Sequence, residues 1–170
     1  TINVDGMKPG HTSQAGYNLV ASATTPNNMR LISVVMGVPT YKGREVESKK
    51  LLQWGFANFE TFKTLEAGKE VSEQPVYYGN KGSVKLGTLQ DSFITVPKGK
   101  QNELKARYEL ESKNLQAPLA KGQVVGKVIY QLEGKDIAAV NLQVMDEVGE
   151  AGIFGKAWDW LVLTVKGLFA

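Results

Sequence analysis

Cysteine is absent from the 170 residues, which excludes disulfide bridges, iron–sulfur clusters and metal sites built on thiolates. The chain has one histidine, His11, so a site that needs several imidazole ligands is excluded as well. No dense group of carboxylates takes the place of such ligands. We therefore expect no bound metal ion.

A strong charge and long apolar runs are also lacking. The net charge is +3 and the lysines are scattered rather than gathered in a stripe, so no nucleic-acid partner is expected. The apolar run near the C-terminus is too short and too charged for a spanning helix, which needs about 20 apolar residues. The start, Thr1-Ile2-Asn3-Val4, carries no initiator methionine and no signal peptide, so we expect a fragment or processed piece.

What is present is an ordinary globular composition, with 42% hydrophobic and 22% charged residues. Three segments are expected to form strands of an antiparallel meander: residues 2–7, 17–24 and 29–36. The third is nearly all apolar, which predicts a strand covered on both faces. From Arg44 to Glu60 the pattern becomes helical, and Leu52, Phe56 and Phe59 are expected to face the sheet.

Residues 61–150 follow a different pattern, in which short strands alternate with glycine-rich turns. Residues 79–82 are rich in types that tolerate positive φ and predict a turn, and residues 133–136 predict a hairpin. Residues 104–111 alternate between apolar and charged side chains, which predicts a strand with one buried and one exposed face. Many short strands without intervening helices are typical of a β-sandwich. We therefore expect a first domain over residues 1–60 and a sandwich over residues 61–150.

The final segment, residues 151–170, predicts an amphipathic helix. Lys156, Asp159 and Lys166 gather on one narrow side, and most of the remaining surface is apolar. Such a helix suits a membrane interface, with tryptophan at headgroup depth. The expected anchor residues are Phe154, Trp158, Trp160, Leu161 and Phe169. The alternative is a helix docked on the protein's own core, although Gly149 and Gly152 would let it swing away.

The most informative stretch is Asp5-Gly6-Met7-Lys8-Pro9-Gly10-His11-Thr12, hereafter the box strand. Its residue types alone are compatible with an ordinary Lys-Pro-Gly turn at a strand end. The stretch resembles the Lys-Thr-Gly box of penicillin-binding proteins and serine β-lactamases. With residues 15–24 and 117–126, it is similar to the D-alanyl-D-alanine carboxypeptidases of the penicillin-binding protein 5 group, and the resemblance continues to the last residue. It implies an α+β fold: the end of a transpeptidase-like domain, then the sandwich and the helix.

The resemblance also implies a reaction and a location. It implies a serine enzyme that trims the terminal D-alanine of peptidoglycan stem peptides and is acylated by β-lactams. It further implies a peripheral protein on the periplasmic side of the bacterial inner membrane, bound to the lipid surface. The N-terminal part of the catalytic domain would be missing from these residues, and no metal or organic cofactor is implied.

Site residues are assigned through the resemblance alone. Lys8 would supply positive charge and support proton transfer, and the backbone N–H of His11 would donate to the oxyanion. Arg44 would lie near the substrate's terminal carboxylate, which suits a planar and permanently charged group. Its alternative role is a residue near a helix N-terminus paired with a nearby glutamate. The full set of substrate-binding positions is Pro9, Gly10, Thr12 and Arg44.

Two departures from the family pattern limit the assignment. Pro9 stands where the family has a threonine whose hydroxyl binds the carboxylate, so this recognition is expected to be weakened. The Ser-x-x-Lys motif of the nucleophile occurs nowhere in the chain, and Ser112-Lys113-Asn114 matches Ser-x-Asn in the wrong place. The chain alone is therefore expected to be inactive. The alternative function is a non-catalytic β-sandwich binding module tethered to the membrane. An intact β-lactamase is disfavoured because that class lacks the sandwich and the anchor.

Overall fold

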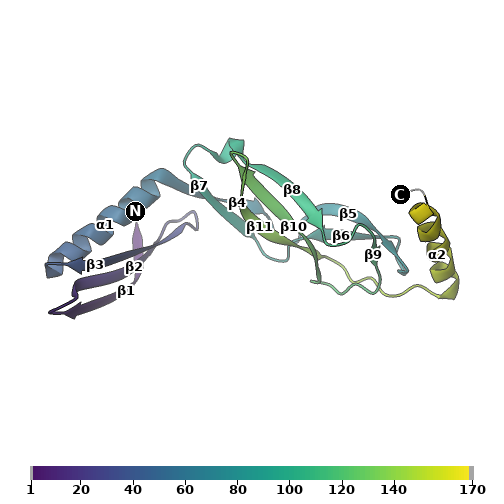
Figure 1. Ribbon diagram of the computed structural model, residues 1–170, viewed down its shortest axis with the longest axis horizontal. Helices are drawn as coiled ribbons and strands as arrows, with labels where there is room; N and C mark the ends of the chain where they lie inside the picture. Colours follow the sequence, from purple (N-terminus) through teal and green to yellow (C-terminus); the bar gives the residue numbers. More distant parts are fainter. Residues whose placement is uncertain (1, 169–170) are drawn as a thin grey trace. The chain divides into compact units, whose positions relative to one another are not determined.

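The computed structural model describes residues 2–168 and has an α+β architecture made mostly of strands (Figure 1). The described chain forms two compact units. One unit contains residues 2–62 and 93–102, and the other contains residues 63–92 and 103–168. The domain limits expected from sequence, after residues 60 and 150, remain predictions.

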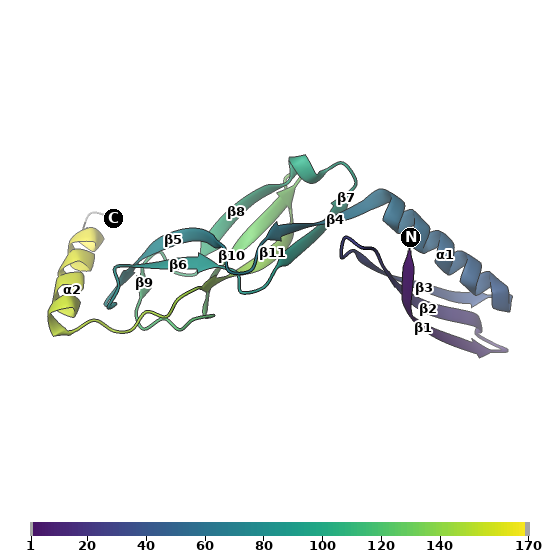
Figure 2. The same ribbon diagram turned by 180° about the vertical axis from the view of Figure 1, so that it is seen from behind.

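The first unit contains a three-stranded antiparallel sheet in the order β1-β2-β3, which confirms the expected meander (Figure 2). Its strands are β1 (Asn3–Thr12), β2 (Gly16–Thr24) and β3 (Arg30–Val38). The box strand therefore does not end in a turn at Pro9, because β1 continues to Thr12 with Pro9 paired to Leu19. The turn reading of these residues is wrong.

Helix α1 (Tyr41–Asn58) packs on β2 and β3. It begins before the expected Arg44 because the Thr40 side chain caps it, accepting a hydrogen bond of 3.1 Å from Gly43 N–H. The buried side is formed by Arg44, Ser48, Leu52 and Gly55, whereas Phe59 already belongs to β4 (Phe59–Leu65). The expected apolar face was therefore only partly right, because two polar side chains lie in the buried stripe.

The face of the sheet opposite α1 is apolar and open in the described chain. Ile32, Val34 and Met36 of β3 are 64%, 56% and 75% exposed. Val20 of β2, which pairs with Val34, is exposed on the same face. The prediction that β3 is covered on both faces is wrong for the described chain. An apolar run shows that a strand can be buried on both faces, but it does not show that a packing partner is present.

The second unit contains a six-stranded sheet in the order β8-β10-β11-β6-β5-β9. Its strands are β5 (Glu70–Tyr77), β6 (Ser83–Gly87), β8 (Lys105–Leu110), β9 (Leu115–Gln116), β10 (Val124–Leu132) and β11 (Lys135–Val144). Its core includes Leu86, Leu142, Val144 and Val148. Strand β4 pairs with β7 (Ser92–Pro97), and the short helix η1 (Gln101–Glu103) follows β7.

The hairpin expected at residues 133–136 is confirmed, and the turn expected at residues 79–82 joins β5 to β6. Strands β5 and β6 are antiparallel, as are β10 and β11, whose turn has positive φ at Glu133 and Gly134. Strand β8 differs from expectation, because Tyr108 is 50% exposed and only Leu110 is partly covered. Ala106 and Tyr108 of this strand are exposed in the described chain, so its alternation does not produce a buried face.

The close approach of β8 and β10 depends on Gly126. A Cβ at this position would collide with the carbonyl oxygen of Glu109 in the backbone of β8. We expect Gly126→Ala to lower the free energy of unfolding by about 1–3 kcal/mol, since a backbone atom cannot rotate away. Urea denaturation followed by circular dichroism measures this change. The matched control is Gly82→Ala, whose added methyl has no neighbour within 4 Å; equal effects of the two substitutions would contradict the prediction.

Candidate functional site

The box strand places its side chains alternately on the two faces of the first sheet. Lys8 lies opposite Val20, on the open apolar face, whereas His11 lies opposite Tyr17, on the face covered by α1. Lys8 and His11 are both exposed in the described chain. The sheet thus separates the lysine from the imidazole, so the two side chains cannot act on one atom together.

Pro9 fixes which backbone groups of the box strand point away from β2. Strand β1 is at the end of the described sheet, and its pairing with β2 continues without a shift from Gly6 to Thr12. Proline has no N–H to donate, and in sheets it is confined to positions whose nitrogen faces an open edge. Because backbone groups two residues apart point the same way in a strand, the N–H of His11 also faces this edge.

The guanidinium of Arg44 is buried beside the box strand. Arg44 is 6% exposed, and its Nη1 donates to the carbonyl oxygens of Gly10 at 3.3 Å and Asn18 at 3.4 Å. Its guanidinium lies over the rings of Tyr41 and Tyr17, with 4.4 Å and 5.6 Å to their centroids. Among the described residues Arg44 pairs with no glutamate, and its guanidinium instead holds the carbonyls of the box strand and of β2.

Tyr17 extends this arrangement to the imidazole. The rings of His11 and Tyr17 are stacked, with centroids 4.0 Å apart, and Tyr17 meets Tyr41 edge to face at 6.2 Å. We call His11, Tyr17, Tyr41 and Arg44 the aromatic cluster. Sequence reasoning missed both tyrosines. The available signal was position, since Tyr17 follows the β1–β2 connection and Tyr41 follows the β3–α1 connection.

The remaining box residues have local roles. Thr12 accepts a hydrogen bond of 2.9 Å at its Oγ1 from Ala15 N–H, which holds the β1–β2 turn. Asp5 forms an ion pair with Arg30 at 2.7 Å. Hydrogen bonds from Arg30 and from Ser22 hold the pKa of the Asp5 carboxyl below its ordinary value. These contacts keep the two ends of β1 in register with β2.

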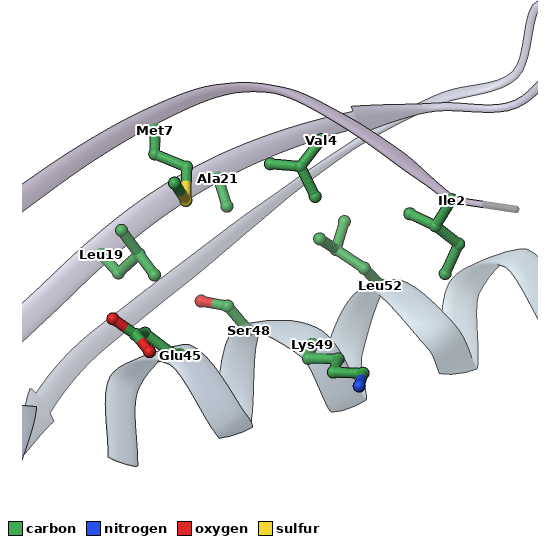
Figure 3. Close-up of a pocket in the computed structure, with 9 residues that line it drawn as sticks. All are labelled: Ile2, Val4, Met7, Leu19, Ala21, Glu45, Ser48, Lys49 and Leu52. Carbon is green, nitrogen blue, oxygen red and sulfur yellow. The ribbon is translucent and has the colours of Figure 1, made fainter. Parts of the chain in front are cut away.

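An apolar cavity of about 230 Å³ lies between the sheet and α1. Figure 3 shows Val4, Met7, Leu19 and Ala21 facing it from the strands, with Leu52 and Ser48 on the helix side. The Ser48 hydroxyl is buried without a hydrogen-bond partner in the described chain. Neither Lys8 nor His11 lines this cavity, so it is not the pocket in which box residues would meet a substrate. In residues 2–168, no group of acidic and imidazole side chains could hold a metal ion.

Helix α2 (Ile153–Leu168) carries the expected anchor residues. Phe154, Trp158, Trp160 and Leu161 are 94%, 66%, 62% and 48% exposed, and Phe169 lies outside the described residues. None of the helices described is long and apolar enough to cross a membrane.

The start of α2 is tied to the turn after β5. Asp159 accepts a hydrogen bond of 2.5 Å from Tyr78 N–H, and Ala151 N–H donates to the Tyr78 carbonyl at 2.7 Å. Gly149 accepts from Asn80 N–H at 2.9 Å. In this structure α2 is therefore in contact with the protein, and the expectation that Gly149 and Gly152 let it swing away remains a prediction.

Comparisons with known proteins agree with this arrangement. Residues 59–150 match the family model of the penicillin-binding protein 5 C-terminal domain, and residues 1–40 match that of the D-alanyl-D-alanine carboxypeptidases. The crystal structure of penicillin-binding protein 5 from Haemophilus influenzae matches with a TM-score of 0.80 and 84% identity, covering 88% of this chain and 43% of that one.

Curated relatives give the same assignment. The chain is 86% identical to the D-alanyl-D-alanine carboxypeptidase DacA of Haemophilus influenzae over its whole length, and 52% identical to that of Escherichia coli K12 over 96% of its length. It spans 43% and 40% of these two relatives, less than half of either. The match over residues 59–150, more than half of the chain, shows that this chain belongs to the penicillin-binding protein 5 family.

Proposed function

We propose that the chain is part of a membrane-anchored, serine-type D-alanyl-D-alanine carboxypeptidase. The enzyme would remove the terminal D-alanine from peptidoglycan stem peptides and would be acylated by penicillin. The observation that carries this proposal is the box strand, which presents Lys8 on an open sheet face and the His11 N–H at an open edge. The names of the relatives support the same reaction.

The nucleophile would come from residues outside this chain, since no Ser-x-x-Lys occurs within it. A serine that approaches Lys8 must lie on the sheet face away from α1. That face is lined by Val20, Ile32, Val34 and Met36, which are apolar and exposed in the described chain. We propose that the N-terminal part of the catalytic domain packs there, because such a patch is costly to leave in water.

The chemistry follows from these positions. The serine oxygen would attack the carbonyl carbon of the penultimate D-alanine, and the C–N bond to the terminal D-alanine would break. Lys8 would favour loss of the serine proton, which would end on the amine nitrogen of the departing D-alanine, and the His11 N–H would donate to the oxyanion. A water molecule would then hydrolyse the acyl-enzyme. Lacking the hydroxyl at position 9, the site would hold the terminal carboxylate more weakly than a site that carries threonine there.

The remaining regions would hold this site at the membrane. We propose that residues 61–150 form a β-sandwich and that α2 lies in the lipid interface on the periplasmic side of the inner membrane. The exposed tryptophans and Phe154 support this placement, since aromatic side chains favour headgroup depth. Peptidoglycan stem peptides and β-lactams would be the ligands of the catalytic part.

A non-catalytic membrane-tethered binding module is the second candidate. Two observations favour it: Pro9 removes the hydroxyl of the box, and the chain contains no nucleophile motif. In that case the box strand would serve only as sheet structure.

Labelling with a fluorescent penicillin separates the two candidates, in the longer protein that contains these residues. We expect Pro9→Thr to raise the acylation rate constant by about 10- to 100-fold, because a hydrogen bond to a charged group contributes about 1.5–3 kcal/mol. The control is Pro9→Val, which restores the backbone N–H and the shape of threonine without its hydroxyl. Failure of the natural, Pro9→Thr and Pro9→Val proteins to label would favour the binding module.

A further inference from the structure

We propose that Arg44, held by Tyr17, is a positioning residue for the oxyanion donor rather than a ligand of the substrate carboxylate. This inference rests on the proposed acyl-transfer function and changes the role of one residue within it. The reason lies in a single peptide plane. The carbonyl that accepts from Arg44 belongs to Gly10, and the N–H bonded to the same carbonyl carbon belongs to His11.

A peptide group is planar and its C=O and N–H point in opposite directions. A guanidinium fixed on the Gly10 oxygen therefore fixes where the His11 N–H points. A charged donor on the carbonyl also withdraws electron density from the amide, which makes its N–H a stronger donor. Pro9 indicates that this N–H faces the open edge, where an oxyanion could lie.

The location of Arg44 favours this role over carboxylate binding. The residue is 6% exposed, and Nη1 is already shared between the carbonyls of Gly10 and Asn18. Its guanidinium lies over the rings of Tyr41 and Tyr17. The Nε of Arg44 is buried without a hydrogen-bond partner in the described chain, so the hydrogen bonds to these two carbonyls hold the guanidinium through Nη1. Moving the guanidinium to a substrate would break these two bonds and separate it from the tyrosine rings.

Tyr17 contacts the side chains on both sides of this peptide group, the imidazole of His11 and the guanidinium of Arg44. Its ring stacks on His11 at 4.0 Å and also lies under the Arg44 guanidinium. His11 and Tyr17 are direct partners in the β1–β2 register, where cross-strand side chains are close enough to pack. Loss of this ring would free the imidazole and the guanidinium together.

The test uses penicillin and its methyl ester, which lacks the carboxylate, on the longer protein in the natural and Pro9→Thr backgrounds. We expect Arg44→Gln and Tyr17→Leu to slow acylation by both compounds by a similar factor, roughly 10- to 100-fold, because small misplacements of a catalytic group have effects of this size. The dissociation constants before acylation should change less than twofold. Tyr17→Phe, which keeps the ring, should acylate at nearly the natural rate, and Tyr108→Leu is the matched control on an exposed tyrosine of β8.

Each alternative has its own signature. If Arg44→Gln slows acylation by penicillin but not by its methyl ester, Arg44 is a ligand of the carboxylate. That result would overturn the inference and leave the proposed function intact. Absence of acylation in every variant and background would overturn the proposed function and this inference with it.

An independent measurement follows the only histidine of the 170-residue chain by proton NMR. The stacked Tyr17 ring should shift the His11 ring protons upfield, and Tyr17→Leu should remove this shift while Tyr17→Phe keeps it. Unchanged His11 signals in Tyr17→Leu would overturn the inference. If Tyr17→Leu does not fold, Arg44→Lys tests the acylation prediction instead, since it keeps the charge but loses the planar fork. Acylation by penicillin and by its ester at the natural rate in Arg44→Lys would then overturn the inference.

Discussion

Replacing Lys8 with alanine in the Pro9→Thr background is expected to lower the rate of penicillin acylation by about 10²- to 10⁴-fold, the range of general acid–base catalysis. Lys8 lies on the sheet face where an incoming serine would approach, and it is exposed in the described chain. Without its charge, loss of the serine proton becomes less favourable. Stopped-flow fluorescence or gel labelling with fluorescent penicillin measures the rate.

Two further variants separate the possible contributions of Lys8. Lys8→Arg keeps the positive charge but cannot give up a proton at neutral pH. Partial acylation activity in this variant would show that Lys8 acts through its charge, and complete loss would show that it transfers a proton. Lys50→Ala is the matched control, because Lys50 is exposed on α1 and pairs with Glu47 at 2.8 Å. Equal rates for Lys8→Ala and Lys50→Ala would reject an acyl-transfer role for the box strand.

Truncation after Gly149 is expected to abolish binding to vesicles that contain anionic lipids. The removed segment carries the exposed side chains of Phe154, Trp158 and Trp160. Burial of one large apolar side chain contributes about 1.5–3 kcal/mol, so two such residues account for roughly 10²- to 10⁴-fold in partitioning. Sedimentation with vesicles of phosphatidylglycerol and phosphatidylethanolamine measures the bound fraction.

A double substitution tests the same claim without shortening the chain. Phe154→Ser with Trp158→Ser should reduce binding strongly, whereas Ile137→Ser, at an exposed apolar position of β11, should not. Vesicle binding that survives both the truncation and the double substitution would reject the anchor. Hydrogen exchange at the Tyr78 amide, which donates to Asp159, reports separately whether α2 leaves the protein when it binds lipid.

Several elements could be predicted because their signals are local. The apolar spacing after Arg44 predicts the start of α1 to within one turn, and the turn residues 133–136 predict the β10–β11 hairpin. Predictions failed where the residue pattern was present but the expected packing partner was not. Strand β8 alternates as a half-buried strand does, yet only Leu110 is partly covered in the described chain. The buried stripe of α1 contains Arg44 and Ser48, which an apolar period cannot identify.

By itself, the sequence determined the family resemblance of the box strand, the order of strands and turns, and the amphipathic character of the tail. These features depend on residue type and on spacing within a few positions of the chain. Only the tertiary structure decided that Arg44 lies on the carbonyl of Gly10, 34 residues away, and that Asp159 reaches Tyr78, 81 residues away. Such contacts depend on packing across the whole unit. The spacing of residues within one segment does not determine which distant side chain will contact it.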